Sequence, residues 1–98
     1  MEYNFEWDPE KAKENWQKHS IRFEQAAAVF RDPRAMTIYD DQHSLAEERW
    51  ITMGISASGI LLVVHHTFRE ETMNSATLRL ISSRKATRKE RRQYTIGE

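Results

Sequence analysis

The segment Ile60-Leu61-Leu62-Val63-Val64-His65-His66-Thr67-Phe68 is the most apolar part of this 98-residue sequence. Its apolar residues form a nearly continuous run rather than an alternating one, which predicts a central strand covered on both faces. The run has only five consecutive aliphatic residues, whereas a membrane-spanning helix needs about 20. We therefore expect the fold to be built around this strand, and we expect no transmembrane helix.

Further strand signals lie on both sides of this segment. Residues 49–56 predict a strand, and Ser56-Ala57-Ser58-Gly59 predicts a tight hairpin turn in which Gly59 adopts a positive φ. A polar bend at residues 70–75 separates the central strand from another strand at 77–83. A short strand at 36–39 and an aromatic strand at 3–7, with its three rings on one face, complete a mostly antiparallel sheet of about five strands.

Helix signals come from capping residues and helical spacing. Asp8 and Pro9 predict the start of a charged helix at about 9–19 with Ala12 and Trp16 on its apolar stripe. A second helix is expected at about 22–31, ended by Asp32-Pro33. Thr87-Arg88-Lys89-Glu90 fits a capping box that begins a short basic C-terminal helix. The sequence thus predicts one α+β domain over residues 1–98, with two N-terminal helices beside the sheet.

The charge is balanced overall but divided along the chain. Residues 1–50 hold seven basic and eleven acidic residues, whereas residues 51–98 hold eight and four. There is no cysteine, which excludes disulfides, Fe–S clusters, zinc-thiolate sites and thiol catalysis. The lack of cysteine is compatible with a reducing cytoplasm. The first residues also lack the pattern of a secretory signal.

The most concentrated chemical feature is the basic segment at residues 84–92. Six of its nine residues are cationic and one is acidic, a density that attracts phosphates. The same composition also fits a solvated terminal helix or a surface that an acidic partner covers. Composition alone leaves nucleic-acid binding and these alternatives open.

The sequence offers little for metal chemistry. Adjacent residues of a strand point to opposite faces, so His65 and His66 cannot chelate one ion. His19 and His43 have no ligand-like spacing with a carboxylate, and we expect no metal and no cofactor. Metal-free RNA cleavage by the ribose 2′-OH needs a base, cations and an acid, and the chain has residues able to supply them at strand ends and in its last helix: His65, His66, Arg69, Arg79, Arg84, Lys85 and Tyr94.

Several blocks of the sequence resemble one known family. They are Phe5-Glu6-Trp7-Asp8, the following helix with Asn15, Lys18-His19, Phe23-Glu24-Gln25-Ala26-Ala27, Val29-Phe30, Glu48-Arg49-Trp50-Ile51-Thr52-Met53-Gly54, His66-Thr67-Phe68-Arg69 and the run from Leu80 to Tyr94. In this order they are similar to the BrnT family, ribonuclease toxins of bacterial type II toxin–antitoxin pairs. The resemblance covers the chain almost end to end.

This resemblance implies a RelE-like fold and a cytoplasmic toxin that cuts RNA and so stops translation. It also implies a BrnA-like ribbon-helix-helix antitoxin, through which alone the pair would contact its operon DNA, and no membrane partner. The sequence departs from the family at Ser20, where glycine is usual, and at Phe68, where tyrosine is common. A phenol at position 68 is therefore not essential here. The segment at 71–76 is also longer than usual.

The resemblance assigns candidate catalytic roles to four residues. Arg69 and Arg84 would hold the scissile phosphate, with ion pairs to neighbouring carboxylates as the alternative for Arg69. His66 would act as base or acid, or be a buried structural histidine, since it shares a face with Val64. Tyr94 would stack on a base or donate a proton, or pack the last helix onto the sheet. RNA-binding roles are assigned to Lys18, His19, Arg79, Lys85, Arg88 and Arg91.

We expect these cationic groups to converge at one end of the sheet, and the antitoxin to cover the basic face at 84–92 by charge complementarity. A second hypothesis is a non-catalytic interaction module whose basic C-terminal region binds an acidic partner protein or DNA. The division of charge between the two halves of the chain fits this hypothesis equally well.

Overall fold

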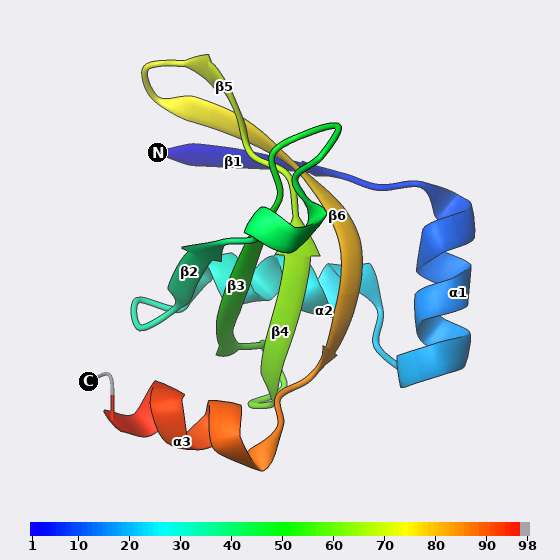
Figure 1. Ribbon diagram of the computed structural model, residues 1–98, viewed down its shortest axis with the longest axis vertical. Coiled ribbons are helices and arrows are strands. Elements are labelled where there is room, and N and C mark those ends of the chain that lie inside the picture. The colour runs from blue at the N-terminus through cyan, green and yellow to red at the C-terminus, as the bar shows by residue number, and fades with distance from the viewer. Residues whose placement is uncertain (97–98) are drawn as a thin grey trace.

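Six strands form one mixed sheet in a computed structural model that describes residues 1–96 (Figure 1). The strand order is β1-β6-β4-β3-β2, and β5 pairs with β6 off this path. The strands are β1 (Glu2–Glu6), β2 (Met36–Tyr39), β3 (Trp50–Ile55), β4 (Leu61–His66), β5 (Arg69–Thr72) and β6 (Ser75–Lys85). The helices are α1 (Pro9–His19), α2 (Phe23–Ala27) and α3 (Arg88–Ile96), with 3-10 turns η1 (Ala28–Arg31) and η2 (Asp41–His43). The α+β class is therefore confirmed.

The central position of β4 follows from its sequence. It lies between β3 and β6 and pairs with both in antiparallel register. On one face Leu62 and Val64 pack under α1 and α2 with Phe23, Val29 and other core residues. On the other face Leu61 and Val63 pack with Met53 against Tyr94 of α3. The prediction of cover on both faces is correct only where α3 lies, because the second face is open around His65.

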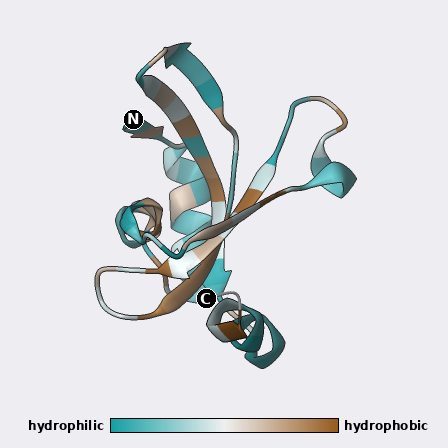
Figure 2. Cartoon of the chain, turned by 90° about the vertical axis from the view of Figure 1, so that its left-hand side faces the viewer, coloured by the Kyte–Doolittle hydropathy of each residue, from teal (hydrophilic) through white to brown (hydrophobic). Residues whose placement is uncertain are grey.

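The sheet differs from the predicted one in two respects. It has six strands, and β1 pairs with β6 in parallel, from Glu2 opposite Ser75 to Glu6 opposite Arg79. The predicted polar bend at 70–75 is instead the end of β5 and a turn that returns into β6. The residues of β5 are polar and exposed, so neither their burial nor their propensity marks a strand, and backbone pairing to β6 alone makes one. Figure 2 shows β5 and α3 as largely hydrophilic and the middle strands as hydrophobic.

The predicted helix at 22–31 is shorter than expected. α2 ends at Ala27 and continues as the tighter turn η1. This turn lies very close to β3, since a Cβ on Gly54 would come within 2.8 Å of Val29 Cγ1. Glycine at position 54 therefore permits the contact between η1 and the sheet. The chain leaves the turn at Asp32, as the Asp-Pro pair predicts.

One buried amide fixes α1 against the sheet. Asn15 donates through Nδ2 to the carbonyls of Ile21 and Ser83 at 3.0 Å, and its Oδ1 accepts from the Ser83 N–H at 2.9 Å. The predicted caps of α1 and α3 and the positive φ of Gly59 are confirmed. On the predicted apolar stripe of α1, Ala12 packs against the core, whereas Trp16 is 46% exposed with the Arg22 guanidinium over its ring.

Substitution of Asn15 by Ala should destabilise the protein by about 3 kcal/mol, because it leaves three buried backbone groups without their partner. Urea unfolding followed by circular dichroism measures this loss. Glu14→Ala, an exposed change on the same helix, should change the free energy of unfolding by less than about 0.5 kcal/mol. Equal stability of the two variants would contradict the anchoring role of Asn15.

Candidate functional site

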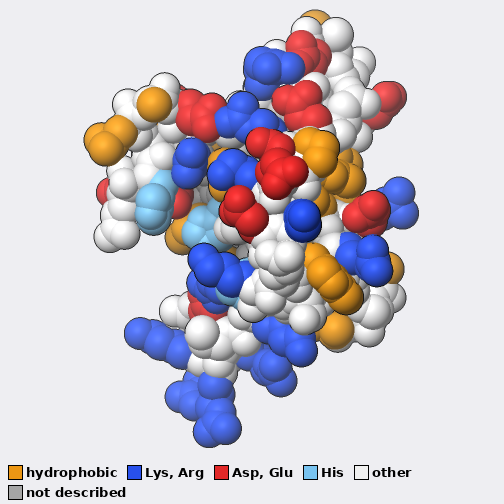
Figure 3. All heavy atoms as spheres, turned by 90° about the vertical axis from the view of Figure 1, so that its right-hand side faces the viewer, with side chains coloured by type: hydrophobic (Ala, Val, Ile, Leu, Met, Phe, Trp, Pro, Cys, Tyr) orange, Lys and Arg blue, Asp and Glu red, His pale blue; other side chains and the backbone are white. Residues whose placement is uncertain are grey.

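A hollow lies on the face of the sheet opposite α1 and α2. The connection at residues 40–49 projects over one end of this face, and α3 crosses the other end (Figure 1). In Figure 3 the surface is hollowed between these two lobes, with histidine and cationic side chains around the hollow. His65 lies opposite Ser82, and Arg84 lies opposite Val63, so both residues belong to this open face. We define the hollow by His65 and Arg84 together with Asp40, His43, Glu47, Arg49 and Arg79 on its rim.

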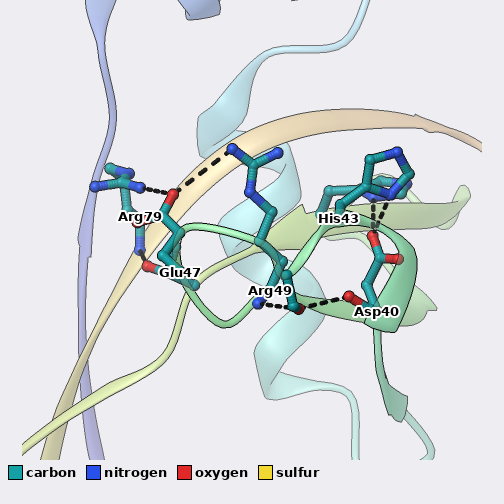
Figure 4. A network of polar contacts seen from close by, with 8 residues as sticks. Asp40, His43, Glu47, Arg49 and Arg79 are labelled. Carbon is teal, nitrogen blue, oxygen red and sulfur yellow. Dashed lines mark hydrogen bonds and ion pairs between the residues drawn. The ribbon is translucent and has the colours of Figure 1, made fainter.

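Hydrogen bonds hold the connection at 40–49 in place. The Asp40 N–H donates to the Arg49 carbonyl at 2.9 Å, and the Arg49 N–H donates to Ser44 Oγ at 3.0 Å. Ser44 Oγ in turn donates to the Asp40 carbonyl at 2.6 Å. The two ends of the connection are therefore joined at the start of β3. The side chains of Asp40 and His43 come from this closed loop (Figure 4).

An ion-pair network occupies the rim beside β6. Glu47 Oε1 accepts from the Arg79 guanidinium and lies 3.6 Å from Arg49 NH2 (Figure 4). The hydrogen bond from Arg79 is the main reason that the pKa of Glu47 lies below its usual value. The Nε atom of Arg49 is buried and has no hydrogen-bond partner among residues 1–96. One carboxylate thus holds two guanidinium groups at the rim.

A second ion pair closes the end of the hollow beside α3. Arg84 binds Glu90 in a bidentate manner, with NH1 to Oε1 at 2.8 Å and NH2 to Oε2 at 3.0 Å. Glu90 also accepts the Thr87 N–H as part of the capping box. The hydrogen bonds from Arg84, supported by those from Thr87, lower the pKa of Glu90 to about 2. The first turn of α3 and the guanidinium of Arg84 are therefore coupled through one carboxylate.

His65 lies between these two charged groups. Its Nδ1 is 3.7 Å from Asp40 Oδ2. Burial lowers the pKa of His65, and the positive charge of Arg84 lowers it further, while Asp40 acts in the opposite sense. The net lowering favours the neutral form of the ring. A neutral imidazole beside a guanidinium can accept a proton next to a bound phosphate.

The structure brings together only some of the predicted residues. Arg79 and Arg84 border the hollow, and Lys85, Arg91 and Tyr94 line a neighbouring groove of about 470 Å³ between α3 and the β3–β4 turn. Arg88 is exposed at the start of α3. Lys85, Arg88 and Arg91 thus lie at the α3 end of the sheet, where Figure 3 shows cationic side chains at the bottom of the molecule.

Other predicted residues lie elsewhere. Arg69 pairs with exposed Glu71 at 2.8 Å. Its register partner Thr77 lies two positions from Arg79 but seven positions before Arg84 on β6, so Arg69 is near the Arg79 end of the strand and about 20 Å along it from Arg84. Lys18 and His19 end α1, on the side of the molecule away from the connection at 40–49. The expectation that all of these groups converge at one end of the sheet is therefore wrong. The sequence predicts where a strand ends, but it does not predict where in the sheet that end lies, since this depends on the strand pairing.

His66 and Tyr94 have structural contacts. His66 is 2% exposed, and its ring nitrogens lie 2.7 Å from Thr52 Oγ1 and 2.9 Å from the Thr67 carbonyl. It is thus the buried histidine of the two alternatives, and it lines a small pocket of about 230 Å³ with Thr37, Trp50 and Phe68. Tyr94 packs against Met53, Leu61 and Val63, and its hydroxyl donates to Asp32 Oδ2 at 2.5 Å. The phenol therefore fixes α3 to the segment after η1.

Four residues of the rim are absent from the predicted site: Asp40, His43, Glu47 and Arg49. The sequence showed only an acidic polar connection, and His43 had no ligand-like spacing. The sequence of β4 did contain a signal for His65. Because side chains alternate along a strand, His65 points to the opposite face from the buried Val64 and His66. Among the described residues, no three histidine, aspartate or glutamate side chains form a group suited to a metal ion. No described helix is long and apolar enough to cross a bilayer.

Comparison with known proteins relates the chain to one family. Residues 7–90 match the family model for the ribonuclease toxin BrnT of type II toxin–antitoxin systems. The structure is similar to the crystal structure of the ribonuclease toxin BrnT from Brucella abortus, with a TM-score of 0.61 and 20% sequence identity, over 90% of this chain and 100% of that chain. At this identity the structural likeness establishes the fold. No curated protein sequence matches the chain.

The Arg84–Glu90 pair predicts how stability depends on pH. Because the pKa of Glu90 is depressed to about 2, its contribution is present above the unfolded-state pKa and is lost as the pH falls towards 2. Glu90→Gln should therefore be about 1 kcal/mol less stable than the parent at pH 7, since a partly exposed pair is screened by water, and this difference should vanish near pH 2. Urea unfolding at several pH values measures it. Arg88→Ala, which leaves the pair intact, should show no such pH-dependent difference; a constant difference for Glu90→Gln would refute the assignment.

Proposed function

This chain belongs to the BrnT family of ribonuclease toxins from type II toxin–antitoxin systems, and from this membership we propose that it is a metal-independent endoribonuclease acting in the cytoplasm. In this proposal the RNA is cut by attack of a ribose 2′-OH on the adjacent phosphate, and translation stops for lack of intact RNA. The single observation that supports it best is the open hollow, in which a guanidinium and a neutral imidazole face the same space.

Arg84 is the cation that we assign to the scissile phosphate. It projects from the end of β6 onto the open face, and its two terminal nitrogens present the planar fork that matches a phosphate. In the free protein this fork is occupied by Glu90. A phosphate gaining charge in the transition state is a stronger acceptor than a partly solvated carboxylate, so the exchange favours the reacting state.

The cationic surface of α3 extends the site beyond the reacting phosphate. Lys85 and Arg91 line the groove beside Tyr94, and Arg88 is exposed nearby. Such side chains bind successive phosphates of a single strand without reading its sequence. We propose that RNA follows this surface into the hollow. Arg69, which lies at the far end of β6, is not part of this path.

The partner follows from the same surface. A type II toxin is held inactive by an antitoxin protein, and we propose a BrnA-like ribbon-helix-helix antitoxin that contacts operon DNA on behalf of the complex. Its acidic residues would cover α3, because charge complementarity is the simplest way to block a phosphate-binding surface. An antitoxin on α3 would also limit access to Arg84, because Arg84 is paired with Glu90 of that helix.

The nuclease assignment predicts cleavage of RNA by the purified chain in the presence of EDTA, tested with and without translating ribosomes. Arg84→Ala should lower the cleavage rate by about 10²–10³, because one transition-state cation is removed. Arg84→Lys should recover only part of the rate, since an ammonium lacks the fork. Lys13→Ala, an exposed cation on α1, is the matched control. RNA that stays intact under both conditions would instead favour a non-catalytic interaction module.

The antitoxin surface is tested by charge reversal on α3. Arg91→Glu should weaken the complex with the ribbon-helix-helix protein of the neighbouring reading frame by at least tenfold, and the loss should shrink at high salt because it is electrostatic. Calorimetry at two salt concentrations measures both effects. Lys11→Glu on α1 makes the same charge change on an exposed residue outside this surface and should leave the affinity unchanged. If the affinity does not depend on salt and Arg91→Glu does not change it, the antitoxin binds another face of the protein.

A further inference from the structure

The rim of the hollow contains a buried carboxylate shared by two histidines. Asp40 is 6% exposed, and its Oδ2 lies 2.8 Å from Nδ1 of His43 and 3.7 Å from Nδ1 of His65. The two rings are therefore neighbours, although they come from η2 and β4. Figure 4 shows His43 and Asp40 with their contact at the edge of the sheet.

Nε2, the second ring nitrogen, is not engaged by Asp40 in either histidine. In the described part of the chain, no hydrogen-bond partner is found for Nε2 of His43 or of His65. His43 is 58% exposed and His65 is 26% exposed. The carboxylate at 2.8 Å from His43 fixes the proton on Nδ1 of that ring and leaves its Nε2 lone pair available, whereas at 3.7 Å from His65 it acts on the ring through its charge. The arrangement orients two imidazoles for proton transfer at Nε2.

Hydrogen bonds within the connection hold the main chain of Asp40 in place. The backbone N–H and carbonyl of Asp40 are both engaged within the closed connection, with Arg49 and Ser44 as partners. These main-chain hydrogen bonds fix the position from which the Asp40 carboxylate reaches the two rings. This contrasts with His66, whose two nitrogens are used up inside the core.

Arg84 places a phosphate beside the rings. Arg84 lies opposite Val63 and His65 lies opposite Ser82 in the β4–β6 pair, so the two side chains are diagonal neighbours on the same face of the sheet. A phosphate held by Arg84 would thus have an imidazole next to it and a second imidazole across the shared carboxylate. This is the minimum set for cleavage by an internal nucleophile: a base, an acid and a cation.

We propose that His65 and His43 are the proton-transfer pair of the ribonuclease reaction and that Asp40 is their positioning residue. This inference rests on the proposed ribonuclease function and adds to it the identity of the acid and the base. His65, which is neutral beside Arg84, takes the proton from the ribose 2′-OH. The oxygen then attacks the phosphorus, an O2′–P bond forms and the P–O5′ bond breaks.

The protonated ring of His43 gives its proton to the departing O5′. The products are a 2′,3′-cyclic phosphate and a free 5′-hydroxyl. One proton is taken up by the protein and one is released to the product, so the step needs neither water nor a redox partner. The charge on the two non-bridging oxygens is held by Arg84 throughout.

The test compares variants in an RNA cleavage assay under the conditions in which the parent protein is active. His65→Gln and His43→Gln should each lower kcat by about 10²–10⁴, while the affinity for an uncleavable 2′-deoxy strand should change less than twofold. Gln42→Ala, next to His43 in the same exposed turn, is the matched control and should keep full activity. Circular dichroism checks that each variant is folded.

The pH profile distinguishes positioning from a merely structural role. The charged groups that face His65 are Asp40 and His43 from the connection and Arg84 from β6, with His66 beside it on β4. Asp40 raises the pKa of His65, so Asp40→Asn should move the acidic limb of the rate profile to lower pH and reduce kcat about tenfold. Proton NMR of the His65 ring should show a titration that matches the acidic limb of the parent profile.

The outcomes separate the two proposals. If the parent chain leaves RNA intact with and without ribosomes, the proposed function fails. If the parent cleaves RNA and both histidine variants cleave it equally well, the nuclease stands and this inference is overturned. If a variant does not fold, the pH dependence of the parent's cleavage rate provides the test. A rate that does not change between pH 5 and 8, or an acidic limb that does not match the titration of the His65 ring, contradicts the assignment.

Discussion

The contact between Asn15 and the backbone of Ser83 determines which way the end of β6 faces. It joins residues 68 positions apart and buries an amide whose hydrogen bonds all go to the main chain. Because side chains alternate along a strand, a Ser83 that faces α1 turns Arg84 to the opposite side. The candidate phosphate-binding group is thus exposed in the hollow because a helix on the other face has fixed its neighbour. A slip of one residue in this register would bury Arg84 and expose Ser83.

The same alternation gives two adjacent histidines different environments. His66 faces the helices, lies 4.9 Å from the Phe30 ring centroid and is enclosed by Thr52 and the Thr67 carbonyl. His65 faces the open side beside Arg84 and Asp40. Burial lowers the pKa of both rings, and His65 is the more exposed of the two, at 26% against 2%. The residue type is therefore a poor guide to the environment of a side chain in β4, whereas the face of the strand is a good one.

The sequence was sufficient wherever structure depends on neighbouring residues. The cap at Asp8, the capping box at Thr87, the turn at Gly59 and the alternating strands follow from local chemistry, and each is present. It was insufficient where tertiary pairing decides, as in the parallel β1–β6 contact and the exposed strand β5. The site shows the same division. Arg84 and the basic helix were identifiable from residue type, but the separation of Arg69 from them depends on the sheet register, and the role of the connection at 40–49 depends on its folding back over His65.

The charge balance of the hollow explains how a phosphate-binding surface can exist in a chain with no net charge. Each of the two cations that face it from β6 has a carboxylate partner, Glu47 for Arg79 and Glu90 for Arg84. Partly exposed ion pairs of this kind contribute only about 0–1 kcal/mol each, so they order the guanidinium groups without holding them strongly. An RNA phosphate need only replace a carboxylate that water already screens, and it finds the donors oriented. Binding is then an exchange of one anion for another. The charge of the carboxylates stays constant during the reaction, whereas the charge on the phosphate oxygens increases towards the transition state. The exchange therefore becomes more favourable as the reaction proceeds.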